Sequence, residues 1–349
     1  MNAEFIEAIA QLAREKQLDK SILFDALETA LLSAYKKNFG GSGNVRVTID
    51  RETGEVSVYS LRRIVSEVKD PNSEMHIDEA KGINPSYLLG DVCETKVTPR
   101  NFGRVAAQTA KQIVVQRIRE AERGMIYQEF TNRECDIVTG VVQRVDRNVI
   151  IDLGKVEALL PQSEQVPGEV YRPGQRLKTY VVEVRKTTKG PQVTVSRSHP
   201  GLLKRLLELE VPEIHDGSVE LRSVAREAGS RSKIAVFARD ENIDPVGACV
   251  GPRGMRIQAI VGELGNEKID VVEFRTDPRE YVTQALSPAK VSRVDIDETT
   301  KVASVIVPDY QLSLAIGKEG QNARLAAKLT GWKIDIKSES QAANMRFRE

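Results

Sequence analysis

Cysteine and histidine are scarce in this chain of 349 residues, which contains three of each. The cysteines Cys93, Cys135 and Cys249 are isolated, odd in number and without a Cys-x-x-Cys pair. This pattern argues against a disulfide framework and even more against a structural zinc site. The histidines show no ligand spacing either. We therefore expect neither a metal nor a cofactor.

Long apolar runs are also missing. The longest, such as Ile113-Val114-Val115, fall far short of the roughly 20 residues that a membrane span needs. The first 17 residues are dotted with charges and lack the apolar stretch of a signal peptide. We therefore expect a cytoplasmic protein without a membrane segment.

No excess of one charge marks the chain as a whole. Lysine and arginine number 51 against 50 acidic residues, for a net charge of +1. Global charge thus gives no sign of a nucleic-acid partner, and any such argument must be local. Hydrophobic residues at 40% and charged residues at 29% are typical of globular proteins, which excludes wholesale disorder. The length predicts two to four domains.

Motifs for catalysis are absent from the sequence. No Gly-x-Gly-x-x-Gly follows a predicted strand, and no Walker loop is present. Gly317-Lys318-Glu319 lacks the earlier glycine spacing and the hydroxyl residue of such a loop. Acidic residues cluster at 295–298, beside Thr299-Thr300, and this cluster is typical of a solvated hairpin turn. We expect no enzymatic activity.

Residues 1–130 predict an α+β domain. Helical spacing covers 5–12 and 19–35, and the second helix ends at Gly40-Gly41. Strands are expected at 45–49, 56–59 and 92–97, and a long helix at 99–121. The nearly balanced charges suit protein docking better than a nucleic-acid surface. A solvated scaffold domain would explain the same composition.

Residues 131–199 change to β structure. Gly and Pro turns separate five short segments rich in Val, Ile and Leu, at 137–142, 149–154, 156–161, 177–184 and 193–196. Five such strands predict a small closed barrel. A packing spacer would have the same pattern.

Basic residues concentrate at the far end of the barrel. From 171 to 205 Glu183 is the only acid, whereas the basic residues are Arg172, Arg176, Lys178, Arg185, Lys186, Lys189, Arg197, Lys204 and Arg205. Such a cluster indicates phosphate contacts, although many charge runs are merely solvated. We select as RNA-binding candidates Arg176, Lys178, Arg185 and Lys186. The main candidates for base stacking are Tyr171 and Tyr180.

The last third contains an internal repeat. Gly251-Pro252-Arg253-Gly254 and Gly317-Lys318-Glu319-Gly320 are each followed by another glycine 14 residues after the first, and then by a candidate strand at 268–271 or 333–336. Strand pairs precede the loops, at 219–224 with 233–237 and at 291–296 with 302–307. The shared order is helix, strand, strand, helix, Gly-x-x-Gly, helix, strand.

A Gly-x-x-Gly turn between helices lets a sugar–phosphate chain approach the backbone, because no Cβ intervenes. Backbone N–H groups and the positive end of the next helix then face phosphate oxygens, as in KH domains that bind single-stranded nucleic acid. One copy is often mere helix packing, but two copies with one spacing are much more specific. The candidate residues are Gly251, Pro252, Arg253, Gly254 and Arg256, and Gly317, Lys318, Glu319 and Gly320. Because Glu319 opposes Lys318, we expect the second loop to hold phosphates less strongly by charge.

Three stretches resemble the NusA family of transcription factors: residues 104–112 followed by 116–118, residues 246–254 and residues 314–326. Residues 154–161 look like part of an S1-type RNA-binding barrel. The resemblance covers essentially the whole chain. It implies a multidomain α+β protein with an N-terminal polymerase-binding domain (1–130), an S1-type OB-fold barrel (131–199) and two tandem type II KH domains (200–276 and 277–349) packed as a rigid pair.

The resemblance also implies a function. It predicts a bacterial factor that docks on core RNA polymerase near the RNA exit channel, on the flap of the β subunit, and holds nascent single-stranded RNA. Such factors modulate pausing, intrinsic termination and, with other elongation factors, antitermination. Some members continue into acidic C-terminal repeats. Here the chain ends at Glu349, so we do not expect self-inhibition by such a tail, and a monomer is sufficient.

Two other functions remain open from the residues alone. KH and S1-type domains also accompany phosphorolytic exoribonucleases, although the chain has no length for a catalytic body. A ribosome-maturation factor would instead sediment with small ribosomal subunits.

Overall fold

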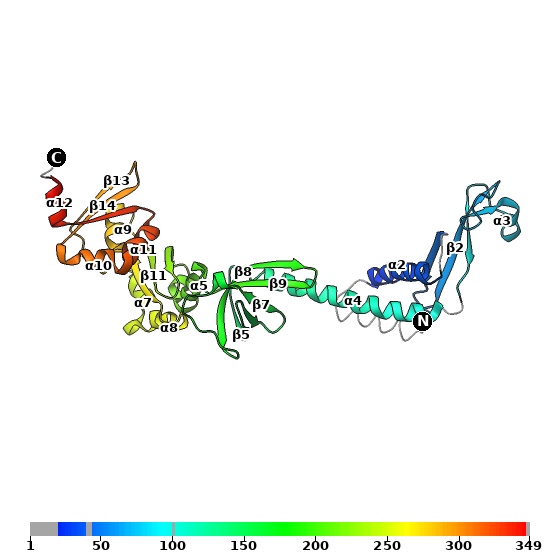
Figure 1. The fold of residues 1–349 in the computed structure, drawn as a ribbon, viewed down its shortest axis with the longest axis horizontal. Helices are drawn as coiled ribbons and strands as arrows, with labels where there is room; N and C mark the ends of the chain where they lie inside the picture. The colour runs from blue at the N-terminus through cyan, green and yellow to red at the C-terminus, as the bar shows by residue number, and fades with distance from the viewer. Residues whose placement is uncertain (1–19, 40–43, 100–101, 347–349) are drawn as a thin grey trace. The chain divides into compact units, whose positions relative to one another are not determined.

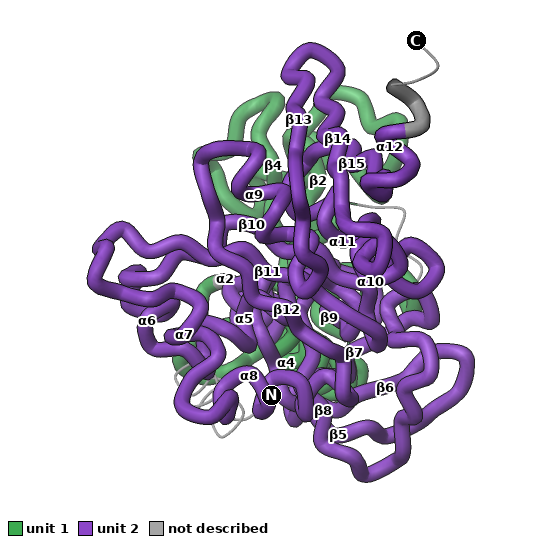
Figure 2. Tube along the Cα trace, turned by 90° about the vertical axis from the view of Figure 1, so that its left-hand side faces the viewer, with its two compact units in different colours: residues 1–125 green, residues 126–349 purple. Residues whose placement is uncertain are grey.

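A computed structural model describes residues 20–39, 44–99 and 102–346 (Figure 1). The chain divides into two compact units, residues 1–125 and 126–349, which Figure 2 distinguishes by colour. The helix predicted over 5–12 lies outside the described residues, as do Asp19 and the glycines at 40–41. Within the described part, no helix is long and apolar enough to cross a bilayer.

The first unit is a four-stranded sheet packed against helices. Strand β2 pairs with β1 and β4 antiparallel and with β3 parallel. Its core joins Leu27 and Leu31 of α2 to Val47 and Val58 of the sheet and to Phe102 of α4. The elements are α2 (Lys20–Phe39), β1 (Asn44–Ile49), β2 (Val56–Val65), β3 (Glu74–His76), α3 (Ile77–Ile83), β4 (Val92–Lys96) and α4 (Phe102–Thr131), the last of which ends in the second unit.

The second unit begins with the predicted five-stranded barrel, which closes in the order β5-β6-β7-β9-β8. Alternating side chains fill it, and Gly140 is required because an added Cβ would lie 2.4 Å from Ile151 Cγ2. The elements are β5 (Ile137–Val145), β6 (Val149–Asp152), β7 (Glu157–Leu160), the 3-10 turn η1 (Gln162–Glu164), β8 (Arg176–Thr187) and β9 (Gly190–Ser196).

Two α+β subdomains follow, and both have the predicted order of elements. In the first, β10 and β11 pair antiparallel whereas β11 and β12 pair parallel. This mixed three-stranded sheet carries α7 and α8 (yellow in Figure 1). The elements are α5 (Pro200–Glu210), α6 (Pro212–His215), β10 (Val219–Glu227), β11 (Arg231–Ala238), α7 (Pro245–Val250), η2 (Pro252–Gly254), α8 (Met255–Glu263) and β12 (Lys268–Glu273).

The second subdomain repeats this topology, with β13–β14 antiparallel and β14–β15 parallel. Asp297, the last residue of β13, accepts hydrogen bonds from the Thr299 N–H at 3.0 Å and the Thr300 hydroxyl at 2.7 Å in the exposed turn that follows, which confirms the predicted solvated turn. The elements are α9 (Pro278–Ala285), β13 (Arg293–Asp297), β14 (Val302–Val307), η3 (Asp309–Gln311), α10 (Leu312–Ile316), η4 (Lys318–Gly320), α11 (Gln321–Thr330), β15 (Lys333–Ser338) and α12 (Glu339–Arg346).

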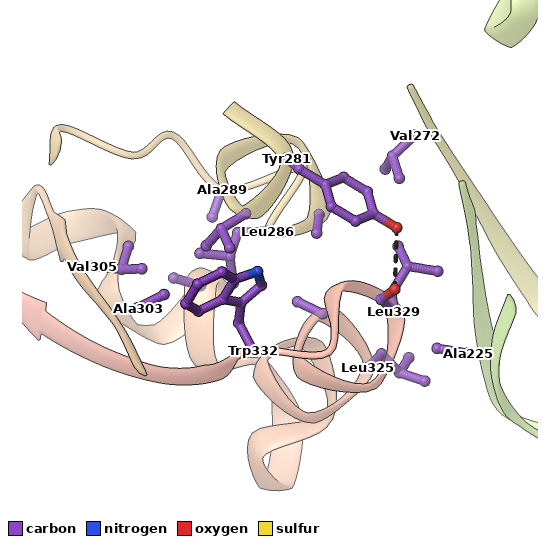
Figure 3. Close-up of a cluster of buried hydrophobic side chains, with 14 of the residues drawn as sticks. Ala225, Val272, Tyr281, Leu286, Ala289, Ala303, Val305, Leu325, Leu329 and Trp332 are labelled. Atoms are coloured by element: carbon purple, nitrogen blue, oxygen red, sulfur yellow. Dashed lines mark hydrogen bonds between the residues drawn. The ribbon is translucent and has the colours of Figure 1, made fainter. Parts of the chain in front are cut away.

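The two subdomains share one core. Ala225 and Val272 of the first pack in the same cluster as Leu325 and Trp332 of the second (Figure 3). Tyr281 is buried in that cluster, and its hydroxyl lies 3.1 Å from the Leu329 carbonyl oxygen (Figure 3). Shared burial of this kind fixes the two subdomains as one packed pair.

The barrel is joined to the first subdomain by a similar seam. Tyr180 of β8 stacks on His199, with ring centroids 4.6 Å apart, and packs against α5. Arg197 is buried and donates to the backbone carbonyls of Lys178 at 3.0 Å and Glu263 at 2.9 Å, so it bonds both sides of the seam. Barrel and subdomains therefore form a continuous body.

Candidate nucleic-acid interface

The two Gly-x-x-Gly loops, residues 251–254 and 317–320, have nearly the same backbone conformation. Their first glycines have φ of 72° and 77°, and their last glycines 77° and 74°. The third residues, Arg253 and Glu319, also have positive φ, at 54° and 52°. Non-glycine residues rarely adopt this left-handed conformation. The repeat inferred from spacing is thus a repeat of an unusual local geometry.

The first and last glycine of each loop serve different purposes. A Cβ on Gly251 would lie 2.7 Å from Arg256 Cγ, and one on Gly317 would lie 2.8 Å from Asn322 Cβ. A Cβ on the last glycine of either loop would have no neighbouring heavy atom closer than 3.9 Å. The first glycine therefore permits packing inside the protein, whereas the last leaves open space in front of the backbone.

In each loop, the residue five positions after the first glycine hydrogen-bonds to the backbone of the helix before the loop. In the first loop Arg256 Nη1 donates to the Ala248 carbonyl oxygen at 2.7 Å. In the second, Asn322 Nδ2 donates to the carbonyl oxygens of Ala315 at 3.1 Å and Leu286 at 3.0 Å. Each side chain satisfies a carbonyl near the end of the helix before the loop, which would otherwise lack an intrahelical partner.

Arg256 is one of the predicted RNA-binding residues, because the sequence places its positive charge at the first loop. In the structure its Nη1 lies 2.9 Å from Glu213 Oε2, and its side chain is 27% exposed. Its charge is therefore compensated within the protein. The geometry gives Arg256 a supporting role, and contact between Arg256 and RNA stays a prediction.

The loop tips differ in charge. Arg253 is exposed and has no hydrogen-bond or ionic partner among the described residues. Lys318 is likewise exposed and unpaired in the described part of the chain, but exposed Glu319 follows it. The first loop is thus positive and the second close to neutral, as the sequence predicts.

The four basic candidates of the barrel all lie on β8, but three of them have partners. Arg185 Nε lies 2.5 Å from Glu183 Oε1, and this hydrogen bond raises the pKa of Arg185. Lys178 Nζ lies 3.4 Å from Glu263 Oε2, and Lys186 Nζ lies 4.5 Å from the centre of the Tyr127 ring. Arg176 is exposed and has no partner among the described residues. The uncompensated charge on β8 is smaller than composition alone suggests.

The tyrosines predicted to stack bases do not face solvent, so that prediction is wrong. Tyr171 and Tyr180 are each 8% exposed. The Tyr171 ring packs in the barrel core, its hydroxyl donates to Glu169 at 2.7 Å, and burial raises the pKa of that hydroxyl. Tyr180 fills the seam with α5, and burial raises its pKa to about 12. Both rings were needed for packing, which a local sequence pattern does not reveal.

Comparison with known proteins connects this geometry to a family. Residues 4–124 match the model of the NusA N-terminal domain, 133–196 the S1 RNA binding domain, and 197–274 and 278–344 the NusA-like first and second KH domains. A Halalkalibacterium halodurans protein named transcription termination/antitermination protein NusA is 61% identical over all of this chain and 92% of its own length. The chain belongs to the NusA family.

A second relative supports this assignment, and one solved structure is similar to part of the chain. The Bacillus subtilis NusA protein is 60% identical over 99% of this chain and 93% of its own length. A solved structure of the N-terminal domain of Bacillus subtilis NusA is 52% identical, covering 35% of this chain and 99% of that one, with a TM-score of 0.33. The NusA relatives are named for transcription termination and antitermination, and the S1 and NusA-like KH domains are RNA-binding domains.

Sequence reasoning missed several residues that shape the interface of this NusA-family chain. Asn322 is one, and superposing the two repeats in the sequence would have paired it with Arg256. Glu227 is another: it accepts from Arg324 Nε at 2.6 Å and thereby connects the two KH domains. Burial of Glu227 favours its protonated form, but the hydrogen bond from Arg324 dominates and lowers its pKa. No local signal marks such a contact, because 97 residues separate its partners. Among the described residues, no cluster of His, Cys, Asp or Glu is arranged to hold a metal ion.

Proposed function

We propose that this chain is an RNA-binding elongation factor that docks on core RNA polymerase near the RNA exit channel through its N-terminal domain, residues 1–130. Its barrel (131–199) and KH domains (200–276 and 277–349) hold nascent single-stranded RNA and so modulate pausing, intrinsic termination and antitermination. The observation that carries the proposal is the pair of Gly-x-x-Gly loops with one backbone geometry and open space before their last glycines. The names of the relatives support the transcriptional role over RNA degradation or ribosome maturation.

Each loop presents main chain to a ribose–phosphate strand. Gly254 and Gly320 have no Cβ to keep a phosphate away, and both precede helices whose N-terminal N–H groups lack intrahelical partners. Helices α8 and α11, with 9 and 10 residues, add a partial positive charge at that end. A phosphate oxygen at this position is held without a dedicated side chain.

Side chains then distinguish the two loops. Arg253 adds a full charge at the first loop, so phosphate binding there depends more on salt. Before the second loop, Leu314 and Ile316 are exposed, whereas their counterparts Ala248 and Val250 are half-buried. Apolar side chains beside a phosphate cradle suit the faces of unstacked bases. We therefore expect the first loop to contribute mainly charge and the second mainly base contacts.

The mechanism requires no chemistry by this protein. Docking on polymerase places the cradles beside newly exiting transcript, so weak contacts become effectively intramolecular. RNA held as a single strand either cannot pair into a hairpin or is positioned to form one. The populations of the elongation states shift accordingly. We propose that the chain acts as a monomer and cooperates with other elongation and antitermination factors.

The RNA-binding part is tested with the double variant Gly254→Asp/Gly320→Asp. Each aspartate places bulk and negative charge where a phosphate would lie, so RNA affinity and its salt dependence should both fall. Gly262→Asp is the matched control, because Gly262 lies in α8 with open space around it and away from the loop. Unchanged affinity and salt dependence in the double variant would show that the loops are not the cradle.

Docking is tested by size-exclusion chromatography of the full chain with core polymerase at micromolar concentration. We expect a complex, and we expect the double glycine variant to form it equally well, since docking is assigned to the other unit. No complex with the wild-type chain would refute the docking assignment while leaving RNA binding intact.

A further inference from the structure

A pocket of about 530 Å³ lies where the barrel, the first KH domain and the second Gly-x-x-Gly loop meet. Ser163 and Gln165 line it from the barrel, and Ser230 lines it from the turn between β10 and β11. Lys318 and Gln321 line it from the second loop and the start of α11. Residues of segments 163–167 and 318–324 thus line the same pocket.

The pocket is continuous with the second phosphate cradle. Residues of that loop form part of its lining, and Gly320 stands between Lys318 and Gln321. An RNA strand whose phosphate lies at Gly320 therefore has a nucleoside next to the pocket. A volume of this size is within the usual range for small-ligand sites and exceeds what one base needs.

The chemistry of the lining selects among ligands. Gln321 Nε2 donates to Glu227 Oε2 at 2.9 Å and to Ser230 Oγ at 2.8 Å, which holds the amide in place. Arg324 is paired with the same Glu227 carboxylate. The charge of Arg324 is therefore compensated inside the pocket, whereas unpaired Lys318 lines it at the loop beside Glu319. The rest of the lining includes neutral groups, among them the Gln321 amide oxygen and the serine hydroxyls.

Neutral donors and acceptors held in fixed positions match the edge of an unpaired base, which single-strand-binding proteins read by hydrogen bonds. We propose that this pocket binds one nucleobase of the RNA strand held at the second loop, and that Ser163 of the barrel contacts that base. The inference rests on the proposed RNA-binding function and deepens it. The barrel and the second KH domain then bind the same nucleotide jointly.

The first test is site-specific photocrosslinking in the full chain. With p-benzoylphenylalanine in place of Ser163 and a labelled single-stranded RNA, irradiation should give a protein–RNA adduct, which should be lost when Gly320→Asp is also present. The same probe in place of Gln162, an exposed neighbour outside the pocket lining, should give little adduct. Equal adducts at both positions, or an adduct at Ser163 that survives Gly320→Asp, would overturn the proposal.

The second test is affinity. Ser163→Glu and Gln162→Glu add the same charge at neighbouring exposed positions, so long-range electrostatics is matched. We expect Ser163→Glu to weaken RNA binding about tenfold, the effect of one lost base contact, and Gln162→Glu to have less than a twofold effect. Equal RNA affinities of the two variants would refute the proposal that the pocket binds a base. A wild-type chain that binds no RNA would instead refute the proposed function itself.

Discussion

Gly251 and Gly254 lie three residues apart in one loop, and substitution at each should lower the stability of the fold for a different reason. Both have positive φ, so any L-residue adds strain of about 1 kcal/mol. Only Gly251→Ala also collides with Arg256. Urea unfolding of the full chain should show Gly251→Ala as more destabilising than Gly254→Ala by about 1–2 kcal/mol. Equal losses would mean that Arg256 moves aside freely.

Arg253 is the exposed, unpaired cation of the first loop. Arg253→Ala should lower RNA affinity at low salt and reduce the slope of log affinity against log salt by about 1, as expected for one lost phosphate contact. Titrations at several salt concentrations measure both quantities. Arg117→Ala on α4, where Arg117 pairs with Glu120, is the control and should change neither. A weaker affinity with an unchanged slope would argue against a phosphate contact.

Individual side chains show where sequence reasoning ends. Arg253 and Lys318 could be assigned to loop tips because the glycine spacing defines the turn. Arg256 follows the same turn by two residues, but Glu213, a partner 43 residues away, determines its role. Tyr180 lies in an alternating strand, and only the docking of α5 shows that its ring is covered. Local patterns reveal what a backbone does, whereas tertiary partners decide which charges and rings remain available.

A buried ion pair connects the end of β10 to the residue before β12 in the first KH domain. Arg226 and Glu267 have side chains 1% and 0% exposed, with Nε and Oε1 3.0 Å apart. Arg226 also donates to the His199 carbonyl oxygen at 2.7 Å. Glu267→Gln leaves a buried charge uncompensated, and we expect it to lower the free energy of unfolding by about 3–5 kcal/mol.

The exposed pair of Arg46 with Glu94 provides the comparison for that measurement. Its side chains are 52% and 38% exposed, so Glu94→Gln should cost less than about 1 kcal/mol. Denaturant unfolding of both variants checks the contrast. Similar losses in the two variants would show that burial does not set the value of the Arg226 pair.

Strand β10 contacts α11 through Glu227, and this contact should respond to acid. The Arg324 hydrogen bond lowers the pKa of Glu227 in the folded chain. Its stabilisation is therefore complete above the unfolded pKa of about 4.3 and is lost as pH falls through the lower folded value. Glu227→Gln should be less stable than wild type at pH 7, with the difference shrinking below pH 4. Thermal unfolding at both pH values measures this, and a constant difference would contradict it.

Most elements could be predicted from the sequence, because the longer strands are rich in Val, Ile and Leu and several of them alternate, and the long helices have apolar residues at helical spacing. Strand β3 and helix α3 were not predicted. Strand β3 has three residues, too few for alternation, and α3 has seven. Both are stabilised by tertiary packing, since Met75 and Ala80 are buried with Ile64 and Cys93 in a small cluster of their own.

The barrel and both KH domains should behave as one cooperative body, since their cores meet at Tyr180 and Tyr281. Tyr180→Ala removes a ring from the seam, and we expect a loss of about 3–5 kcal/mol. Native-state hydrogen exchange should then speed up in both β8 and α5. Tyr310→Ala, which removes a ring that is 77% exposed, is the control and should change neither. Faster exchange in β8 alone would show that the seam does not couple the domains.

The tandem KH repeat could be predicted from the sequence, because the two copies have the same spacing between their glycines. The four domain types could be recognised from their motifs. The contacts between the domains could not be predicted from the sequence. In the sequence Arg197 is one of several basic residues in a run. In the structure it is buried and donates to backbone carbonyls of two domains. Association of domains depends on surfaces whose members lie far apart along the chain.

The common core of the KH pair bears on the proposed RNA binding. Because Gly254 and Gly320 lie on subdomains that share this core, the distance between the two proposed phosphate-binding points is constant. A transcript bound at both points must have a set number of nucleotides between them: a shorter tether cannot reach, and a longer one must loop out. Affinity should thus peak at one spacer length, which gives the chain a way to discriminate transcripts by the separation of their binding elements.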